Sequence, residues 1–213
     1  MDKRACIFDM DGTLVDSMVY WQRLGREYLA SRGVTENVEP VLERIKPMTM
    51  LESAALFMET FGLPGTPESV AAEMNAVMDE HYRSDIPLKP GALEYLKKLH
   101  ARGVRLCVAT ATPEHLARLC LERLGAAELL EFILSCDAVG AGKDRPDVFL
   151  EAARRLGTAP ADTAAYEDAF FAAQTAKNAG FYTVGVYDAA GAARWQQLQA
   201  LADETIFDWR NET

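Results

Sequence analysis

The sequence has few cysteines, fewer basic than acidic side chains and no long hydrophobic run, and each shortage excludes a class of protein. Its four cysteines form no CxxC pair, which disfavours a zinc site or a disulfide framework and predicts reduced thiols in the core. Thirty-two acidic against 22 basic residues give a formal charge of -10, which disfavours nucleic acid and anionic membranes as partners. No apolar run approaches the ~18 residues of a membrane span, and no signal-peptide pattern is present. We therefore expect a cytoplasmic protein, monomeric by default.

What is present is an alternation of strand and helix patterns. Short β-rich runs are separated by segments with apolar residues at helical spacing, and Pro146 and Gly157 stand where one helix should begin and end. Alternating strands and helices predict a parallel sheet covered on both faces, a doubly wound α/β fold. The expected strands are 5–8, 104–110, 132–136, 163–168 and 182–186, and helices are expected at 146–157 and 170–180.

Residues 17–84 interrupt this alternation. They contain no convincing strand, but four amphipathic helical stretches at 17–32, 38–46, 49–62 and 67–83, the last opened by Thr66 and Pro67. Nearly seventy residues exceed what one crossover between strands requires. We predict an α/β core domain of residues 1–16 and 85–213 and an inserted helical domain of residues 17–84.

Polar side chains follow the expected strands and pose a problem of charge. Asp9 and Asp11 stand two residues apart after an apolar strand, and carboxylates that close repel each other. The carboxyl ends of parallel strands share one edge of a sheet, where ligands bind, so further residues should converge there: Thr110, Lys143, Glu167 and Asp168. Several carboxylates with one lysine require a divalent cation, and hard oxygen ligands suit Mg2+.

With these residues the chain resembles the haloacid-dehalogenase-like phosphatases, in the phosphoglucomutase-like branch that carries a helical cap after the first motif. The family's four motifs occur in order: DMDGT at 9–13, the Thr110-Ala111 pair, Lys143 in K-x-x-P-D, and YED at 166–168. The resemblance covers essentially the whole chain. It implies a Mg2+-dependent phosphatase for a small phosphorylated metabolite, with residues 17–84 as the cap.

The same resemblance implies roles for the motif residues. Asp9 would attack phosphorus to form an aspartyl phosphate, and Asp11 would act as general acid and then as general base. Gly12 would permit the tight departure of the chain from the strand, and Thr13 would fix that turn by a bond from its hydroxyl. Thr110 and Ala111 would bind the phosphate, and Lys143 would neutralise charge between Asp9 and the transferring group.

The implied metal site draws on the first and last motifs. Mg2+ would be held by Asp9, Asp168 and the backbone carbonyl of Met10, and Glu167 would act from a second layer or through water. Asp11 also counts among the expected metal-binding residues.

Two departures from the branch bear on specificity. Trp21 stands where phosphomutases often carry histidine, and Pro47 stands where they carry glycine, so mutase activity is the alternative rather than the leading hypothesis. A catalytically silent protein that binds a phosphorylated ligand is a third hypothesis. In the cap, Arg44, Lys46 and Trp21 are the candidates for contact with substrate.

Overall fold

The computed structural model describes residues 3–45 and 48–212 and divides into two compact units. One unit comprises Met1–Met18 and Ile86–Thr213, and the other comprises Val19–Asp85. The larger unit contains the sheet, and the smaller one is built from helices.

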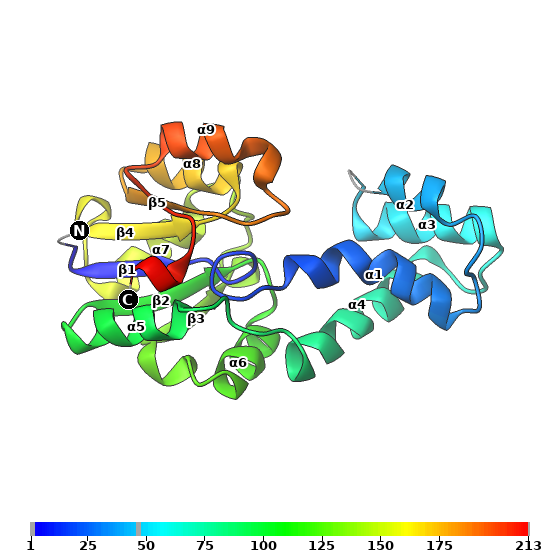
Figure 1. The fold of residues 1–213 in the computed structure, drawn as a ribbon, viewed down its shortest axis with the longest axis horizontal. Coiled ribbons are helices and arrows are strands. Elements are labelled where there is room, and N and C mark those ends of the chain that lie inside the picture. Colours follow the sequence, from blue (N-terminus) through cyan, green and yellow to red (C-terminus); the bar gives the residue numbers. More distant parts are fainter. Residues whose placement is uncertain (1–2, 46–47, 213) are drawn as a thin grey trace. The chain divides into compact units, whose positions relative to one another are not determined.

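The larger unit is organised around a six-stranded parallel sheet in the order β3-β2-β1-β4-β5-β6 (Figure 1). This order confirms the doubly wound α/β fold. The sixth strand was not predicted, because three residues with only Ile206 buried carry no recognisable periodicity. The strands are β1 (Ala5–Phe8), β2 (Arg105–Thr110), β3 (Phe132–Ser135), β4 (Thr163–Glu167), β5 (Tyr182–Val186) and β6 (Glu204–Ile206).

Helices cover both faces of this sheet. A core cluster joins one face of β1, β2 and β4 to α7 (Asp147–Leu156) and α8 (Phe170–Asn178), and α9 (Trp195–Leu201) packs beside α8. On the opposite face, α5 (Ala92–Ala101) packs against β2, and α6 (Glu114–Arg123) packs against β3. The predicted end of α7 is confirmed, because Gly157 adopts a left-handed conformation with φ of 64° and caps the helix.

The direction of winding reverses at β1, and this reversal positions the site. From β1 the chain proceeds outward through β2 and β3 on one side, and through β4, β5 and β6 on the other. In such sheets the ligand crevice lies beyond the carboxyl ends of the strands at the reversal. Asp9 directly follows β1, and its N–H donates to the carbonyl of Tyr166 on β4 over 3.0 Å.

Among its described residues the smaller unit contains four helices, which confirm the four predicted helical stretches. They pack around buried side chains that include Tyr28, Phe57 and Met74. Thr66 caps the last helix and Pro67 begins it, as expected. The helices are α1 (Met18–Ser31), α2 (Glu39–Ile45), α3 (Met50–Phe61) and α4 (Pro67–Ser84). In the described part of the chain, no helix is both long enough and apolar enough to cross a membrane.

Candidate active site

The centre of the site is a buried ion cluster at the carboxyl ends of β1 and β4. Lys143 lies in the loop before α7, and its Nζ donates to Oδ1 of Asp9 and, over 2.7 Å, to Oε1 of Glu167. All three side chains are buried. Burial lowers the pKa of Lys143, but the charges of Asp9 and Glu167 outweigh it and leave that pKa raised. Lys143 is therefore held as a cation against the carboxylate of Asp9.

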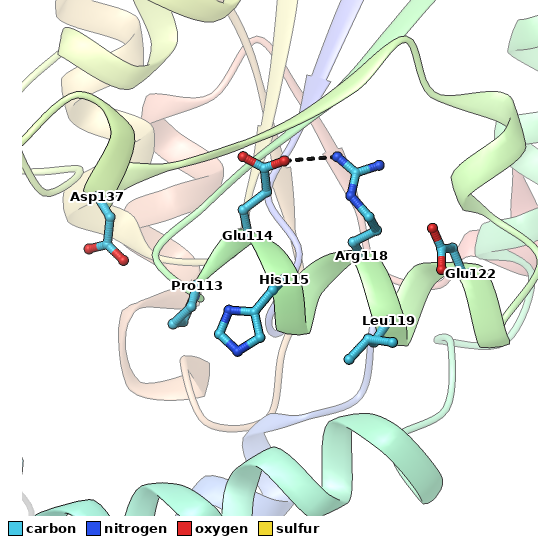
Figure 2. Close-up of a pocket in the computed structure, with 7 residues that line it drawn as sticks. All are labelled: Pro113, Glu114, His115, Arg118, Leu119, Glu122 and Asp137. Carbon is cyan, nitrogen blue, oxygen red and sulfur yellow. Dashed lines mark hydrogen bonds and ion pairs between the residues drawn. The ribbon is translucent and has the colours of Figure 1, made fainter.

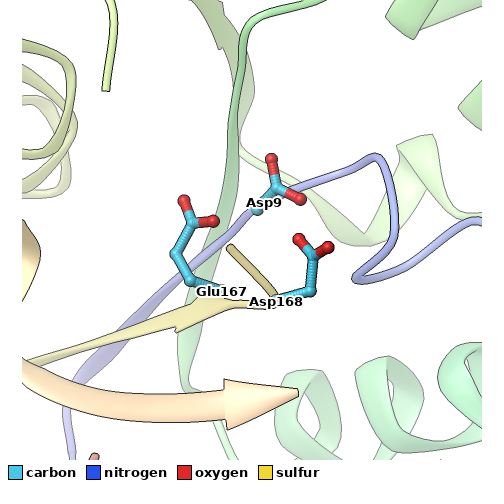
Figure 3. A group of neighbouring side chains, drawn as sticks. All are labelled: Asp9, Glu167 and Asp168. Atoms are coloured by element: carbon cyan, nitrogen blue, oxygen red, sulfur yellow. The ribbon is translucent and has the colours of Figure 1, made fainter. Parts of the chain in front are cut away.

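Three carboxylates converge beside this lysine. One oxygen each of Asp9, Glu167 and Asp168 lies within 4.8 Å of the others (Figure 3). Burial raises the pKa of Asp168 to about 7, with help from the charges of Asp9 and Asp188. Burial likewise raises the pKa of Glu167 well above its usual range. The positive charge of Lys143 therefore compensates the negative charge of these three carboxylates only in part.

The donor set fits a divalent cation. Oδ2 of Asp9 is fully buried, and no donor among residues 3–45 and 48–212 reaches it. A buried oxygen without a partner is costly unless another group binds it. Hard carboxylate oxygens are the ligands that Mg2+ and similar ions prefer. Asp9 and Asp168, with Glu167 beside them, are the residues that would hold such an ion.

Asp11 lies apart from the three-carboxylate group. The hydroxyl of Ser17 donates to its Oδ1 over 2.7 Å, and the hydroxyl of Thr112 donates to its Oδ2 over 2.7 Å. These two bonds fix the orientation of the Asp11 carboxylate. Sequence reasoning missed Ser17 and Thr112, whose only signal was a hydroxyl close to a motif.

The turn between Asp9 and Val15 explains why glycine stands at position 12. Gly12 has φ of 83°, and a Cβ there would overlap the carboxylate of Asp168. The expected role of Gly12 in this turn is thus confirmed. The carbonyl oxygen of Met10 accepts the N–H groups of Leu14 and Val15, each over 2.9 Å, and its expected role as a metal ligand stays a prediction. The Met10 carbonyl closes the turn.

The second motif lies at the end of β2, next to β1. Thr110 is fully buried, and its Oγ1 accepts the N–H of Thr112 over 3.0 Å. Ala111 is exposed directly after the strand. Lys89 and Asp188, which sequence reasoning also missed, form an ion pair of 2.9 Å beside Asp168. Nothing in the spacing of Lys89 and Asp188 along the chain indicates that they meet.

An open pocket of about 660 Å³ adjoins the second motif (Figure 2). Along α6, Glu114 and Arg118 form an ion pair of 2.8 Å. Asp137 lies across from the start of that helix in the view of Figure 2. The pocket's acidic side chains outnumber its basic ones, and Pro113 and Leu119 are apolar. The lining residues are Pro113, Glu114, His115, Arg118, Leu119, Glu122 and Asp137.

The residues expected to touch substrate from the helical unit are placed as follows. Trp21 on α1 donates its Nε1–H to the hydroxyl of Tyr82 over 3.2 Å. Arg44 is exposed in the last turn of α2. Lys46 and Pro47 lie outside the described residues.

Comparison with known proteins agrees with this geometry. A family model for haloacid dehalogenase-like hydrolases matches residues 3–180. The (DL)-glycerol-3-phosphatase 1, mitochondrial, of Arabidopsis thaliana is 31% identical over 192 residues, which cover 85% of this chain and 63% of that protein, so the chain spans less than two thirds of that relative. Validoxylamine A 7'-phosphate phosphatase of Streptomyces hygroscopicus subsp. limoneus is 30% identical over 213 residues, which cover 97% of this chain and 96% of that protein.

A solved structure adds evidence on the fold. The crystal structure of CbbY from Rhodobacter sphaeroides matches with a TM-score of 0.75 at 24% identity, over 97% of this chain and 95% of that one. The family model spans most of the 213 residues and includes the whole ion cluster around Asp9. The chain therefore belongs to the haloacid dehalogenase-like hydrolases.

Proposed function

We propose that this protein is a Mg2+-dependent phosphatase that hydrolyses a small phosphate monoester through an aspartyl phosphate on Asp9. The observation that carries the proposal is the state of the Asp9 carboxylate. One oxygen is held by Lys143, and the other is buried without a donor in the described structure. A carboxylate fixed by one oxygen beside a cation is suited to attack on phosphorus.

In the first step, an oxygen of Asp9 forms a bond to phosphorus while the bond from phosphorus to the ester oxygen breaks. Asp11, entering as the protonated acid, gives its proton to the departing oxygen. In the second step, Asp11 takes a proton from a water molecule that attacks the phosphorus and releases Asp9. The hydroxyls of Ser17 and Thr112 fix the orientation of Asp11 for both transfers.

Charge neutralisation supplies most of the stabilisation that phosphoryl transfer needs. Lys143 faces Asp9 as a cation, and Thr110 with the N–H of Ala111 would bind phosphate oxygens at the end of β2. A Mg2+ ion bound by Asp9 and Asp168 would neutralise charge on the phosphoryl oxygens, with Glu167 supporting it from beside Lys143.

The helical unit is assigned the role of a cap. It is inserted directly after the first motif, at residues Val19–Asp85, and it has a core of its own. A separate unit at this place in the chain suits a lid that excludes water and selects the leaving group. Trp21, Arg44 and Lys46 remain the proposed substrate contacts from this unit.

The charge of the pocket beside the second motif supports a proposal for the substrate class. Three carboxylates line it, and its arginine is already paired with one of them, so a second anionic group on the substrate would meet repulsion. The names of two relatives refer to glycerol 3-phosphate and to the 7'-phosphate of validoxylamine A. Both names refer to a phosphate of a small molecule, and glycerol is a polyol. We propose a phosphorylated polyol or sugar whose leaving group is uncharged.

The test is release of inorganic phosphate from a panel of phosphorylated metabolites in Mg2+. We expect turnover of polyol or sugar phosphates, its loss in Asp9→Asn, and its retention in Asp162→Asn, which alters an exposed carboxylate at the amino end of β4. Conversion of a sugar phosphate to its isomer without free phosphate would instead favour the phosphomutase alternative. Absence of any turnover, with a phosphorylated ligand still bound, would favour a binding protein.

A further inference from the structure

The last part of the chain lies outside the region that the family model matches, which ends at residue 180. It contains a short 3-10 helix, Trp209–Asn211, whose start is capped by the side chain of Asp208 on the N–H of Arg210 over 2.9 Å. Lys98 on α5 donates to the carbonyl of Glu212 over 2.7 Å. A Cβ at Gly91 would come within 2.6 Å of the Arg210 nitrogen, so glycine leaves room for this segment. The segment is therefore docked specifically.

Trp209 is the anchor of this segment, because its side chain is only 2% exposed. Its ring stacks on Tyr166 with centroids 5.9 Å apart, and it lies 6.3 Å from Phe8 and 5.0 Å from Tyr95. Phe8 directly precedes Asp9 on β1, and Tyr166 directly precedes Glu167 on β4. The indole thus packs behind the strand ends that carry the site.

One polar bond links the indole to the catalytic turn. Trp209 donates its Nε1–H to the carbonyl of Thr13 over 3.0 Å, and both residues are buried. The hydroxyl of the same Thr13 donates to Oδ1 of Asp168 over 3.3 Å. Two successive hydrogen bonds therefore connect the C-terminal segment with a proposed metal ligand.

We propose that Trp209 is a positioning residue that fixes the 9–15 turn and, through Thr13, the orientation of Asp168 for metal binding. The inference rests on the proposed metal site, and it assigns a role to a residue that the family match does not include. A buried carbonyl in a turn has few alternative partners, so the indole N–H selects one orientation of Thr13. Groups that orient metal ligands commonly alter metal affinity when they are changed.

The experiment compares Trp209→Phe with Tyr95→Phe by calorimetric titration of Mg2+. Trp209→Phe keeps an aromatic ring and removes the N–H, whereas Tyr95→Phe removes a hydroxyl that bonds to Tyr166 over 2.9 Å in the same cluster. We expect the Mg2+ dissociation constant to rise roughly three- to tenfold in Trp209→Phe, below the range for direct partners of a ligand. Tyr95→Phe should bind Mg2+ as the parent protein does.

A double-mutant cycle tests the route through Thr13. Thr13→Val removes the hydroxyl that reaches Asp168, so adding Trp209→Phe to it should cause little further loss of Mg2+ affinity. Parent-like Mg2+ binding by Trp209→Phe, or full additivity of the two changes, would overturn the proposal. Failure of the parent protein to bind Mg2+ would instead overturn the proposed metal site.

A second measurement covers the case in which Trp209→Phe does not fold. In a protein with Trp21→Phe and Trp195→Phe, Trp209 is the remaining tryptophan of the three. Its fluorescence should change on Mg2+ titration with the dissociation constant found by calorimetry. An emission unaffected by saturating Mg2+ would show that the turn and the indole are not coupled, and would overturn the proposal.

Discussion

Replacing Lys143 by methionine removes the only positive partner that the described structure shows for Asp9. Lys143 is 7% exposed and bonds to Asp9 and Glu167, so Lys143→Met would leave two buried carboxylates facing each other. Breaking a buried ion pair by removing one partner costs about 3–5 kcal/mol. For a chain of this size each kcal/mol lowers the unfolding midpoint by about 2–4 °C, so we expect a loss of roughly 6–20 °C for the larger unit.

The assay is a thermal unfolding scan at pH 8 in the presence of a chelator, repeated with saturating Mg2+. The loss should shrink with Mg2+, because the ion would compensate Asp9 in place of the lysine. Lys97→Met, at an exposed lysine on α5, is the matched control and should remain near the parent midpoint. Turnover by Lys143→Met should fall by at least about 10²-fold, as for loss of a group that stabilises developing charge. A midpoint within 2 °C of the parent protein (about 1 kcal/mol or less) would refute the reasoning.

Three further predictions concern Asp11, the choice of metal ion and His81. The Asp11→Asn variant is given an aryl phosphate whose leaving group needs no proton. It should release about one equivalent of aryl alcohol in a burst and retain a phosphoryl group on Asp9, because the amide cannot activate water. Steady parent-like turnover, with no adduct by mass spectrometry, would contradict this. Ca2+ should bind yet inhibit, because its larger coordination shell can engage both oxygens of Asp9, and equal phosphate release in Ca2+ and Mg2+ would argue against a nucleophilic Asp9. Burial lowers the pKa of His81, but bonds of 2.9 Å to Asp85 and 3.1 Å to Glu27 outweigh it and leave that pKa raised. The imidazolium therefore stabilises the helical unit below about pH 6.5 and loses this effect as pH rises through the folded pKa, so His81→Gln should lower that unit's unfolding midpoint more at pH 5.5 than at pH 8.5.

Most of the features that were predicted correctly depend on residues close together in the chain. The alternation of short strands and helices was readable because it depends on side-chain periodicity within ten or so residues. The position of Asp9 at a strand end and the need for glycine at position 12 were also readable, because a strand end and a tight turn depend on a few consecutive residues. The convergence of Lys143 and Glu167 on Asp9 followed from the rule that parallel strands share a carboxyl edge.

The hydrogen bonds inside the first motif were not predicted. The Met10 carbonyl accepts two N–H groups inside the turn, and the motif spacing did not predict these bonds. The hydroxyls of Ser17 and Thr112 bond to the two oxygens of Asp11, and neither partner was predicted. Motif spacing specifies which residues are near one another, but it does not specify which way each carbonyl or carboxylate points.

By itself the sequence determined the strand and helix pattern, the insertion of a helical unit after the first motif, and the set of charged residues at the sheet edge. Only the tertiary structure decided which residues from distant parts of the chain bond to the site and its neighbours. The bond from Trp209 to Thr13 spans 196 positions, and the pairing of Lys89 with Asp188 spans 99. Such contacts depend on strand order and on where the C-terminal segment docks. These are properties of the packed molecule, and no local periodicity encodes them.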